Sequence, residues 1–159
     1  MSTEDLVRSI QAEESKAEIS TDCEFYIPEK YQLGILVNYL DRHGFEYTTE
    51  GRIFCYPIDI LCKRGETTVS IEMKSNNVSR GIEQAWRNSD FVDFSYLAVW
   101  EERLTDSLID RVRNTPVGLF AISEGVDQIS SPRKTGEQLC SRDMVYSSIE
   151  DHVRDDASV

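Results

Sequence analysis

Apolar residues follow a helical spacing in the first third of the chain. Pro28 suits an early helix position because its fixed φ is already helical. Gly44 suits the end of a helix because it tolerates a positive φ. Between them, four residues recur at i, i+3, i+4 and i+7, the spacing of a helix that packs one face on a core: Leu33, Leu36, Val37 and Leu40. The pattern therefore predicts a core-facing helix directly after Pro28.

The spacing changes to that of strands between residues 45 and 74. This segment is rich in Ile, Val, Tyr, Phe and Thr, which favour pleated strands. Turn residues interrupt it twice, at Glu50-Gly51 and at Arg64-Gly65-Glu66. We therefore expect three consecutive strands, over residues 45–49, 52–63 and 67–74, with the last two joined as a hairpin.

Helices and strands alternate in the rest of the chain. A helix is expected from Ser79, a suitable N-cap, to about Asp90. The apolar run Phe94–Trp100 is typical of a strand buried on both faces and paired parallel after a helical crossover. Trp86 and Trp100 are expected in the core. Further elements are expected over residues 105–113 (helix), 117–123 and 126–129 (strands), and after 131 (helix).

This order predicts an α/β fold with a mixed central β-sheet flanked by helices. Its core reads α-β-β-β-α-β and is followed by an α-β extension. We divide the 159 residues into an acidic N-terminal helix or arm (1–24), a central domain (25–130) and a C-terminal helix or tail (131–159). No stretch has the length of a membrane helix, and the N-terminus lacks the apolar core of a signal peptide. We therefore expect a cytoplasmic protein with no membrane partner.

Four cysteines are expected to be reduced packing residues. They show no Cys-x-x-Cys spacing, and they form no zinc-like pattern with the two histidines: Cys23, Cys55, Cys62 and Cys140. Buried free cysteine behaves as a small hydrophobic residue.

Charge is strongly negative over most of the chain. The net charge is −12, the pI is about 4.6, and lysines number 5 against 12 arginines. An acid-rich, lysine-poor surface suits a saline cytoplasm, where salt screens self-repulsion; an ordinary acidic protein is the alternative. The window from Arg52 to Arg87 is the exception, because six bases outnumber four acids there.

Two of these strands carry a group of polar residues near their ends. Asp59 lies on one strand, and Glu72 and Lys74 lie two residues apart on the next. Because side chains alternate along a strand, Glu72 and Lys74 share a face. The hairpin register that buries the neighbouring isoleucines brings Asp59 close to Glu72. Two adjacent carboxylates repel each other, and a hard divalent cation relieves that cost. Lys74 adds a positive charge that stabilises developing negative charge.

The segments Pro57-Ile58-Asp59 and Glu72-Met73-Lys74 resemble the motif of the PD-(D/E)xK nuclease superfamily. The expected α-β-β-β-α-β order is similar to that superfamily's restriction-endonuclease-like core, over roughly residues 28–100. The sequence departs from the family pattern at one point, because Ile58 separates Pro57 from Asp59.

The resemblance implies roles for five residues. Asp59 and Glu72 would bind Mg²⁺ (or Mn²⁺), and Lys74 would assist the nucleophile. Many members carry a polar residue, often Gln, on the following helix, and Gln84 matches it. Some members complete the metal shell with an acid on the first helix, for which Glu29 is the candidate.

The function implied is a Mg²⁺-dependent endonuclease acting on DNA. The small core carries no sequence-reading module, which favours structure-directed cutting as in the Holliday-junction resolvases of the superfamily. Cutting two strands needs two sites, so a homodimer is expected. The residues expected to contact the nucleic acid are Arg80, Arg87, Lys63 and Arg64. Two alternatives stay open. One is a nuclease-like domain without catalysis that binds nucleic acid or protein, and the other is an unrelated small α/β interaction domain.

Overall fold

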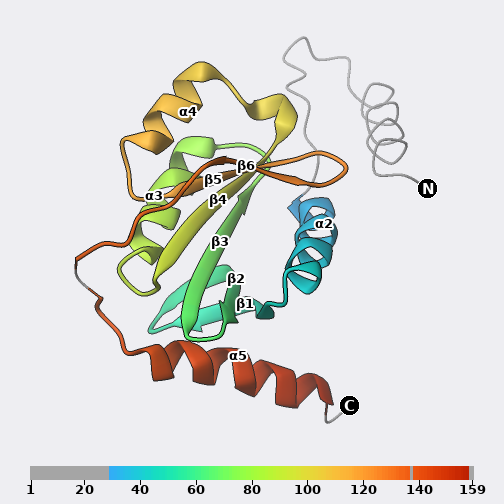
Figure 1. The fold of residues 1–159 in the computed structure, drawn as a ribbon, viewed down its shortest axis with the longest axis vertical. Helices are drawn as coiled ribbons and strands as arrows, with labels where there is room; N and C mark the ends of the chain where they lie inside the picture. The colour runs from blue at the N-terminus through green and yellow to red at the C-terminus, as the bar shows by residue number, and fades with distance from the viewer. Residues whose placement is uncertain (1–28, 137, 158–159) are drawn as a thin grey trace.

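A six-stranded mixed β-sheet with helices on both faces forms the molecule (Figure 1). The computed structural model describes residues 29–136 and 138–157. Within them the elements follow one another as α2 (Glu29–Arg42), β1 (Glu46–Ile53), β2 (Tyr56–Arg64), β3 (Thr67–Lys74), α3 (Val78–Asn88), β4 (Phe94–Trp100), η1 (Glu101–Arg103), α4 (Asp106–Arg113), β5 (Gly118–Ile122), β6 (Val126–Ser130) and α5 (Arg142–Ala157). The expected N-terminal arm (1–24) and Cys23 lie outside the described residues.

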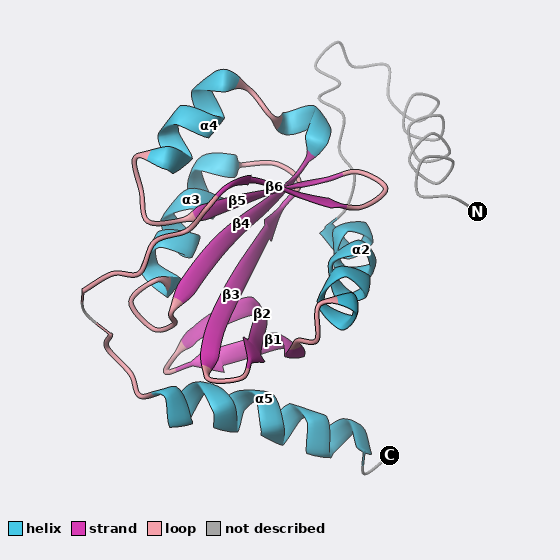
Figure 2. Cartoon of the chain, in the orientation of Figure 1, coloured by secondary structure: helices cyan, strands magenta, loops and turns pink. Residues whose placement is uncertain are grey.

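The strands lie side by side in chain order, β1 to β6. The pairs β1–β2, β2–β3 and β5–β6 are antiparallel, whereas β3–β4 and β4–β5 are parallel after the crossovers through α3 and α4. Helix α2 covers one face, α3 and α4 cover the other, and α5 runs across the β1–β2 end (Figure 2). The predicted α/β class, the α-β-β-β-α-β order and the parallel strand 94–100 are confirmed.

Helix α2 forms as its apolar spacing predicts. Leu36 and Leu40 are fully buried against the sheet. Gly44 follows the helix with φ +74°, a conformation that glycine adopts without steric cost. Gln32 occupies the same buried stripe, one turn before Leu36, and is fully buried. The stripe that holds α2 on the sheet therefore also brings a polar side chain under the helix.

Strand β1 does not end at Glu50-Gly51, where a turn was expected. It continues to Ile53, and the turn falls at Phe54-Cys55. A Cβ on Gly51 would lie 2.8 Å from Leu61 Cδ1 on the neighbouring strand. The glycine therefore serves close packing between two strands and does not mark a chain reversal.

The β2–β3 hairpin has the register that the sequence predicts. Ile60 pairs with Ile71, and the turn consists of Gly65 and Glu66. Gly65 supplies the positive φ, +61°. The two isoleucines of β2 pack in different clusters: Ile60 lies under α2, whereas Ile58 packs with the residues under α5.

A buried carboxylate attaches the C-terminal segment to this sheet. Asp93 is 2% exposed and accepts hydrogen bonds from the Thr68 amide (3.0 Å), Gln138 Nε2 (3.0 Å) and Arg142 (3.2 Å). Burial raises the pKa of this carboxyl, but these hydrogen bonds and the Arg142 charge more than offset burial and hold the pKa below its ordinary value. Beyond this anchor, α5 buries two apolar residues against β1 and β2, Val145 and Ile149.

Two expectations about buried side chains do not hold. Cys62 is buried and Cys140 is half-buried, but Cys55 is exposed because it lies in the β1–β2 turn. Trp100 is 3% exposed, whereas Trp86 on α3 is 48% exposed. No helix in the described part of the chain is both long and apolar enough to cross a membrane.

We predict that Asp93→Asn weakens the fold in a pH-dependent way. At pH 7 the variant should lose about 2 kcal/mol of unfolding free energy, since Thr68, Gln138 and Arg142 lose a charged acceptor. A lowered folded pKa gives stability that is present above about pH 4 and is lost as pH falls. The difference from the parent should therefore shrink below pH 4, as urea unfolding at pH 3 and pH 7 would measure.

Asp127→Asn is the matched control for this substitution, because Asp127 is exposed on β6. It should change the unfolding free energy by less than about 0.5 kcal/mol at either pH. An equal loss in Asp93→Asn at pH 3 and pH 7 would contradict the assignment.

Candidate functional site

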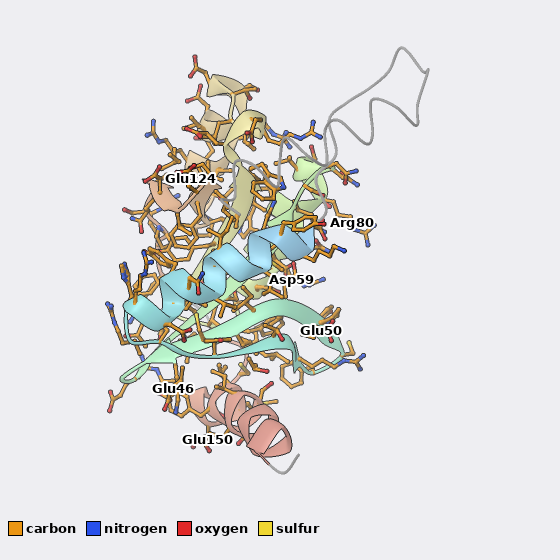
Figure 3. The ribbon with its side chains drawn as sticks, turned by 90° about the vertical axis from the view of Figure 1, so that its right-hand side faces the viewer. Glu46, Glu50, Asp59, Arg80, Glu124 and Glu150 are labelled. Carbon is orange, nitrogen blue, oxygen red and sulfur yellow. The ribbon has the colours of Figure 1, made fainter. Side chains whose placement is uncertain are left out.

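Two carboxylates meet where β2 and β3 separate. Ile60–Ile71 is the pair of the β2–β3 ladder that lies furthest from the hairpin turn. Asp59 and Glu72 are the next residues beyond this pair, one on each strand. Asp59 Oδ2 accepts a hydrogen bond from the Met73 amide at 2.9 Å, which fixes the side chain between the strands. In Figure 3, Asp59 lies below α2, toward the end at which that helix begins. The predicted closeness of Asp59 and Glu72 is thus present in the structure.

Glu72 is buried beside a second negative charge. It is 3% exposed, and its Oε1 accepts a hydrogen bond from Asn88 Nδ2 at 2.8 Å. Burial and, after it, the neighbouring Asp59 raise the pKa of Glu72 to about 8, although the Asn88 hydrogen bond and the Lys74 charge oppose the rise. Without a cation, Glu72 therefore holds a proton at neutral pH.

This carboxylate pair fits a hard divalent cation. A cation that replaces the proton would relieve both the burial cost and the repulsion, and Mg²⁺ typically uses only one or two carboxylates, with water and phosphate oxygens as its other ligands. Among the described residues, no group of three or more His, Cys, Asp or Glu side chains gathers as a metal shell. Glu29 instead accepts a long hydrogen bond from the Ser75 amide, at 3.4 Å. The structure thus assembles two of the three predicted metal ligands.

Lys74 reaches the pair across a glycine of α3. A Cβ on Gly81 would lie 2.5 Å from Lys74 Cγ and 2.8 Å from Leu97 Cδ1. Gly81 therefore leaves room for the lysine stem between helix and sheet. The Lys74 carbonyl also accepts a hydrogen bond from Gln32 Nε2 at 2.9 Å. Helix α2 therefore contacts the backbone of Lys74 through Gln32, and helix α3 contacts its side chain at Gly81.

Among the described residues, the buried side-chain oxygens of Gln84 and Gln32 have no hydrogen-bond partner. Gln84 was predicted as a site residue, and it lines an open groove of about 550 Å³ along α3. Gln32 was missed, although its position in register with Leu36 and Leu40 could have revealed it. Unsatisfied buried acceptors carry a cost that a water or ligand donor can relieve.

Asn88 was also missed by the sequence analysis. It is fully buried and follows Gly81 and Ala85 on the buried face of α3. A polar residue in this stripe is the signal that would have found it. Its role is to hold Glu72 in place through a hydrogen bond.

The four residues predicted to contact nucleic acid separate into two pairs. Arg80 and Arg87 line the α3 groove together with Gln84. Lys63 and Arg64, the other pair, lie at the hairpin end of β2 and do not line this groove. Lys63 forms ion pairs with Glu46 (3.3 Å) and Glu150 (3.5 Å), which Figure 3 labels beside α5.

Arg64 is likewise engaged at the hairpin end. Its Nη1 donates a hydrogen bond to the His43 carbonyl at 3.3 Å, and its guanidinium lies over the Phe45 ring. Both bases therefore serve packing of the chain on itself, away from the carboxylate pair.

Solved structures that resemble this chain include two distant neighbours. No family model matches the sequence. No curated protein matches it either. A crystal structure of a protein of unknown function aligns with a TM-score of 0.45 and 15% identity, over 57% of this chain and 56% of that chain. The structure of Pyrococcus furiosus SfsA in complex with Ca²⁺ aligns with a TM-score of 0.36 and 11% identity, over 67% of this chain and 63% of that chain.

The chain thus spans less than two thirds of the length of either neighbour. Both TM-scores lie below 0.5, so neither likeness carries an argument about family or function.

We predict that Glu72→Gln removes a pH-dependent loss of stability. A folded pKa of about 8, raised from 4.5, gives stability that is present below pH 4.5 and lost as pH rises through 8. In EDTA the parent should lose on the order of 3 kcal/mol of unfolding free energy between pH 5 and pH 9. Glutamine cannot ionise, so the variant should escape this loss, which urea unfolding at both pH values measures.

Glu83→Gln is the control for this experiment, because Glu83 is an exposed glutamate on α3. It should follow the parent at both pH values. If Glu72→Gln followed the parent as well, the buried, repelled carboxyl would not be the source of the pH dependence.

Proposed function

We propose that this protein is a divalent-cation-dependent endonuclease that hydrolyses DNA phosphodiester bonds by direct attack of water. The observation that carries the proposal is the buried Glu72 carboxylate beside the half-buried Asp59, with Lys74 next to the pair. Such a pair is costly without a cation and is suited to bind one. The adjoining groove, with Arg80 and Arg87, offers positive charge for phosphates.

Each residue of the site has a defined task in this proposal. Asp59 and Glu72 hold the cation, and Asn88 keeps Glu72 in position. When bound, Mg²⁺ or Mn²⁺ supplies Lewis-acid charge that lowers the pKa of a water and neutralises the phosphate. Lys74 stabilises the negative charge that develops on the phosphate oxygens. The unpartnered Gln84 oxygen accepts a hydrogen bond from the attacking water and orients it.

We further propose that the structure of the DNA, and not its sequence, selects where the enzyme cuts. Within the described residues, the chain adds to its core only η1, α4, the β5–β6 hairpin and α5. The charged groove contacts the sugar-phosphate backbone, which carries no sequence information directly. Selection of a DNA shape is therefore the specificity that this surface supports.

A binding-only role is the second candidate, and the net charge of −12 favours it. Neutralisation of phosphates normally dominates affinity for nucleic acid, and a strongly acidic protein opposes it. The discriminating measurement is Mn²⁺ binding, because a binding module has no need of a cation at Asp59 and Glu72.

We predict metal-dependent cleavage that depends on the carboxylates and the lysine. A labelled panel of linear duplex, single strand, flap and four-way junction should be cut in Mg²⁺ or Mn²⁺ and not in EDTA. Asp59→Asn, Glu72→Gln and Lys74→Ala should each lower the cleavage rate at least 100-fold, since each removes charge from the reaction centre.

Glu124→Gln is the matched control, because Glu124 is exposed in the β5–β6 turn and lies far from Asp59 in Figure 3. It should cut at the parent rate. Cleavage that persists in EDTA or survives all three site substitutions would sink the nuclease proposal. Isothermal titration with Mn²⁺ adds a readout independent of activity, with binding expected in the parent and lost in Asp59→Asn.

A separate prediction concerns Gly81 as a positioning residue for Lys74. Gly81→Ala adds a Cβ 2.5 Å from Lys74 Cγ and 2.8 Å from Leu97 Cδ1. Leu97 is fully buried and has no room to shift, so the stem of Lys74 has to move. Gains in helix propensity of about 1 kcal/mol and overpacking costs of about 1–3 kcal/mol should leave the variant folded. We expect kcat to fall more than tenfold with little change in KM.

Gly34→Ala on α2 is the control, since no atom lies within 4 Å of the added Cβ. It should raise helix stability and leave kcat unchanged. Equal kcat values for the two alanine variants would show that Lys74 tolerates displacement, or that it has no part in the reaction.

A further inference from the structure

The β1–β2 turn exposes an aromatic side chain on a strained backbone. Phe54 is 56% exposed and has φ +56°, a left-handed conformation that bulky residues rarely adopt. Glycine would satisfy this turn without steric cost. Backbone strain of this kind persists where the surrounding structure enforces it, and it gathers at functional sites. The exposed ring is therefore a candidate contact surface.

Two exposed rings rest here on one buried ring. Phe91 is 5% exposed. Phe54 meets it edge-on with ring centroids 5.8 Å apart, and Tyr56, 37% exposed, stacks on it at 5.7 Å. We name Phe54, Tyr56 and Phe91 the aromatic tip. Because Phe91 fixes both outer rings, little side-chain entropy is left to lose when a ligand stacks on them.

A chain of contacts joins the aromatic tip to the carboxylate pair. The Arg87 guanidinium lies 4.4 Å from the Tyr56 ring centroid, and its Nη2 donates to Asn88 Oδ1 at 3.4 Å. Asn88 in turn donates to Glu72 at 2.8 Å. Along β2, Tyr56 precedes Asp59 by three residues, about 10 Å of strand. That distance corresponds to roughly three stacked nucleotides at 3.4 Å each.

The charge around the tip favours a polyanion as its occupant. Three arginines lie here: Arg87 lies against the tip, Arg80 lines the α3 groove, and Arg52 is exposed on β1 close to the turn. They outnumber the two acids of the same surface, Glu50 and Glu83. Aromatic rings interleaved with arginines form the usual surface for unpaired nucleic acid, where bases stack on the rings and cations follow the phosphates. Paired bases inside a duplex have no free face for such stacking.

We propose that the aromatic tip stacks unpaired bases next to the scissile phosphate, so that the substrate is DNA with single-stranded nucleotides beside the cut. This inference rests on the proposed endonuclease function and narrows its substrate class to single strands, flaps and opened junctions. Phe54 supplies the outermost stacking face, and Tyr56, held between Phe91 and Arg87, supplies the second.

Phe54→Gly tests the proposal without endangering the fold, because glycine relieves the positive φ while it removes the ring. In EDTA, where no cutting occurs, fluorescence anisotropy should show roughly tenfold weaker binding of a single-stranded oligonucleotide by this variant and by Tyr56→Leu. Duplex binding should stay unchanged. A 2-aminopurine base in the oligonucleotide should be quenched by the parent and not by Phe54→Gly, which reports stacking directly.

Trp86→Ala is the matched control, since Trp86 is 48% exposed on α3 and is not among the residues that line the groove. It should bind the single strand as the parent does. Undiminished single-strand binding by Phe54→Gly, equal losses for duplex and single strand, or no DNA binding by the parent would each overturn the proposal.

The two proposals fail in distinguishable ways. Quenching and single-strand binding by a parent protein that never cuts DNA in Mg²⁺ or Mn²⁺ would remove the endonuclease function and leave the tip as a base-binding surface. Cutting that is equally fast on duplex and single strand, with no effect of Phe54→Gly, would keep the endonuclease function and remove the stacking role.

Discussion

The burial of Glu72 beside the half-buried Asp59 is the constraint on which the rest of the site depends. The two carboxylates are neighbours because Ile60 pairs with Ile71, and a slip of one residue would turn one of them to the opposite face of the sheet. The cost of burying Glu72 beside a second carboxylate is partly offset by the Met73 amide, by Asn88 and by the charge of Lys74. The pKa of Glu72 nevertheless stays near 8, so the protein alone does not satisfy the pair. The unmet part of this cost is the physical reason to expect a cation.

Local rules were sufficient to predict the sheet and the carboxylate pair. Strand alternation and the turn at Gly65 set the hairpin register, and the long apolar run of β4 indicated a parallel strand. The sequence was least informative where contacts distant along the chain decide. Gly51 lies in a strand because the space of its missing side chain is filled by Leu61, and Lys63 forms an ion pair with Glu150, which lies 87 residues away in sequence. Trp86 is exposed because α3 packs on the sheet through another face, and the choice of that face depends on tertiary packing.

The acidic character of the chain and its proposed polyanionic substrate are compatible because charge acts locally. Exposed charges are largely screened beyond about 8–10 Å at physiological ionic strength. Glu46 and Glu150 lie at the hairpin end of the sheet, where Lys63 partly neutralises them. The groove along α3 has two arginines at the other end. A cation on the carboxylate pair would also neutralise the negative charge nearest to the groove.

Backbone strain is concentrated at the same end of the sheet. In the described part of the chain, the residues other than glycine with positive φ are Glu50, Phe54 and Asn77. The β1–β2 register places Glu50 across from Asp59, Phe54 forms the aromatic tip, and Asn77 lines the α3 groove. At the hairpin end the same backbone requirement is met by Gly65 without a steric cost. Asparagine adopts a positive φ at little cost, but a bulky residue such as Phe54 pays on the order of 1 kcal/mol. Because glycine would have met the backbone requirement of this turn, the ring of Phe54 is explained by the proposed stacking of bases and not by the stability of the turn.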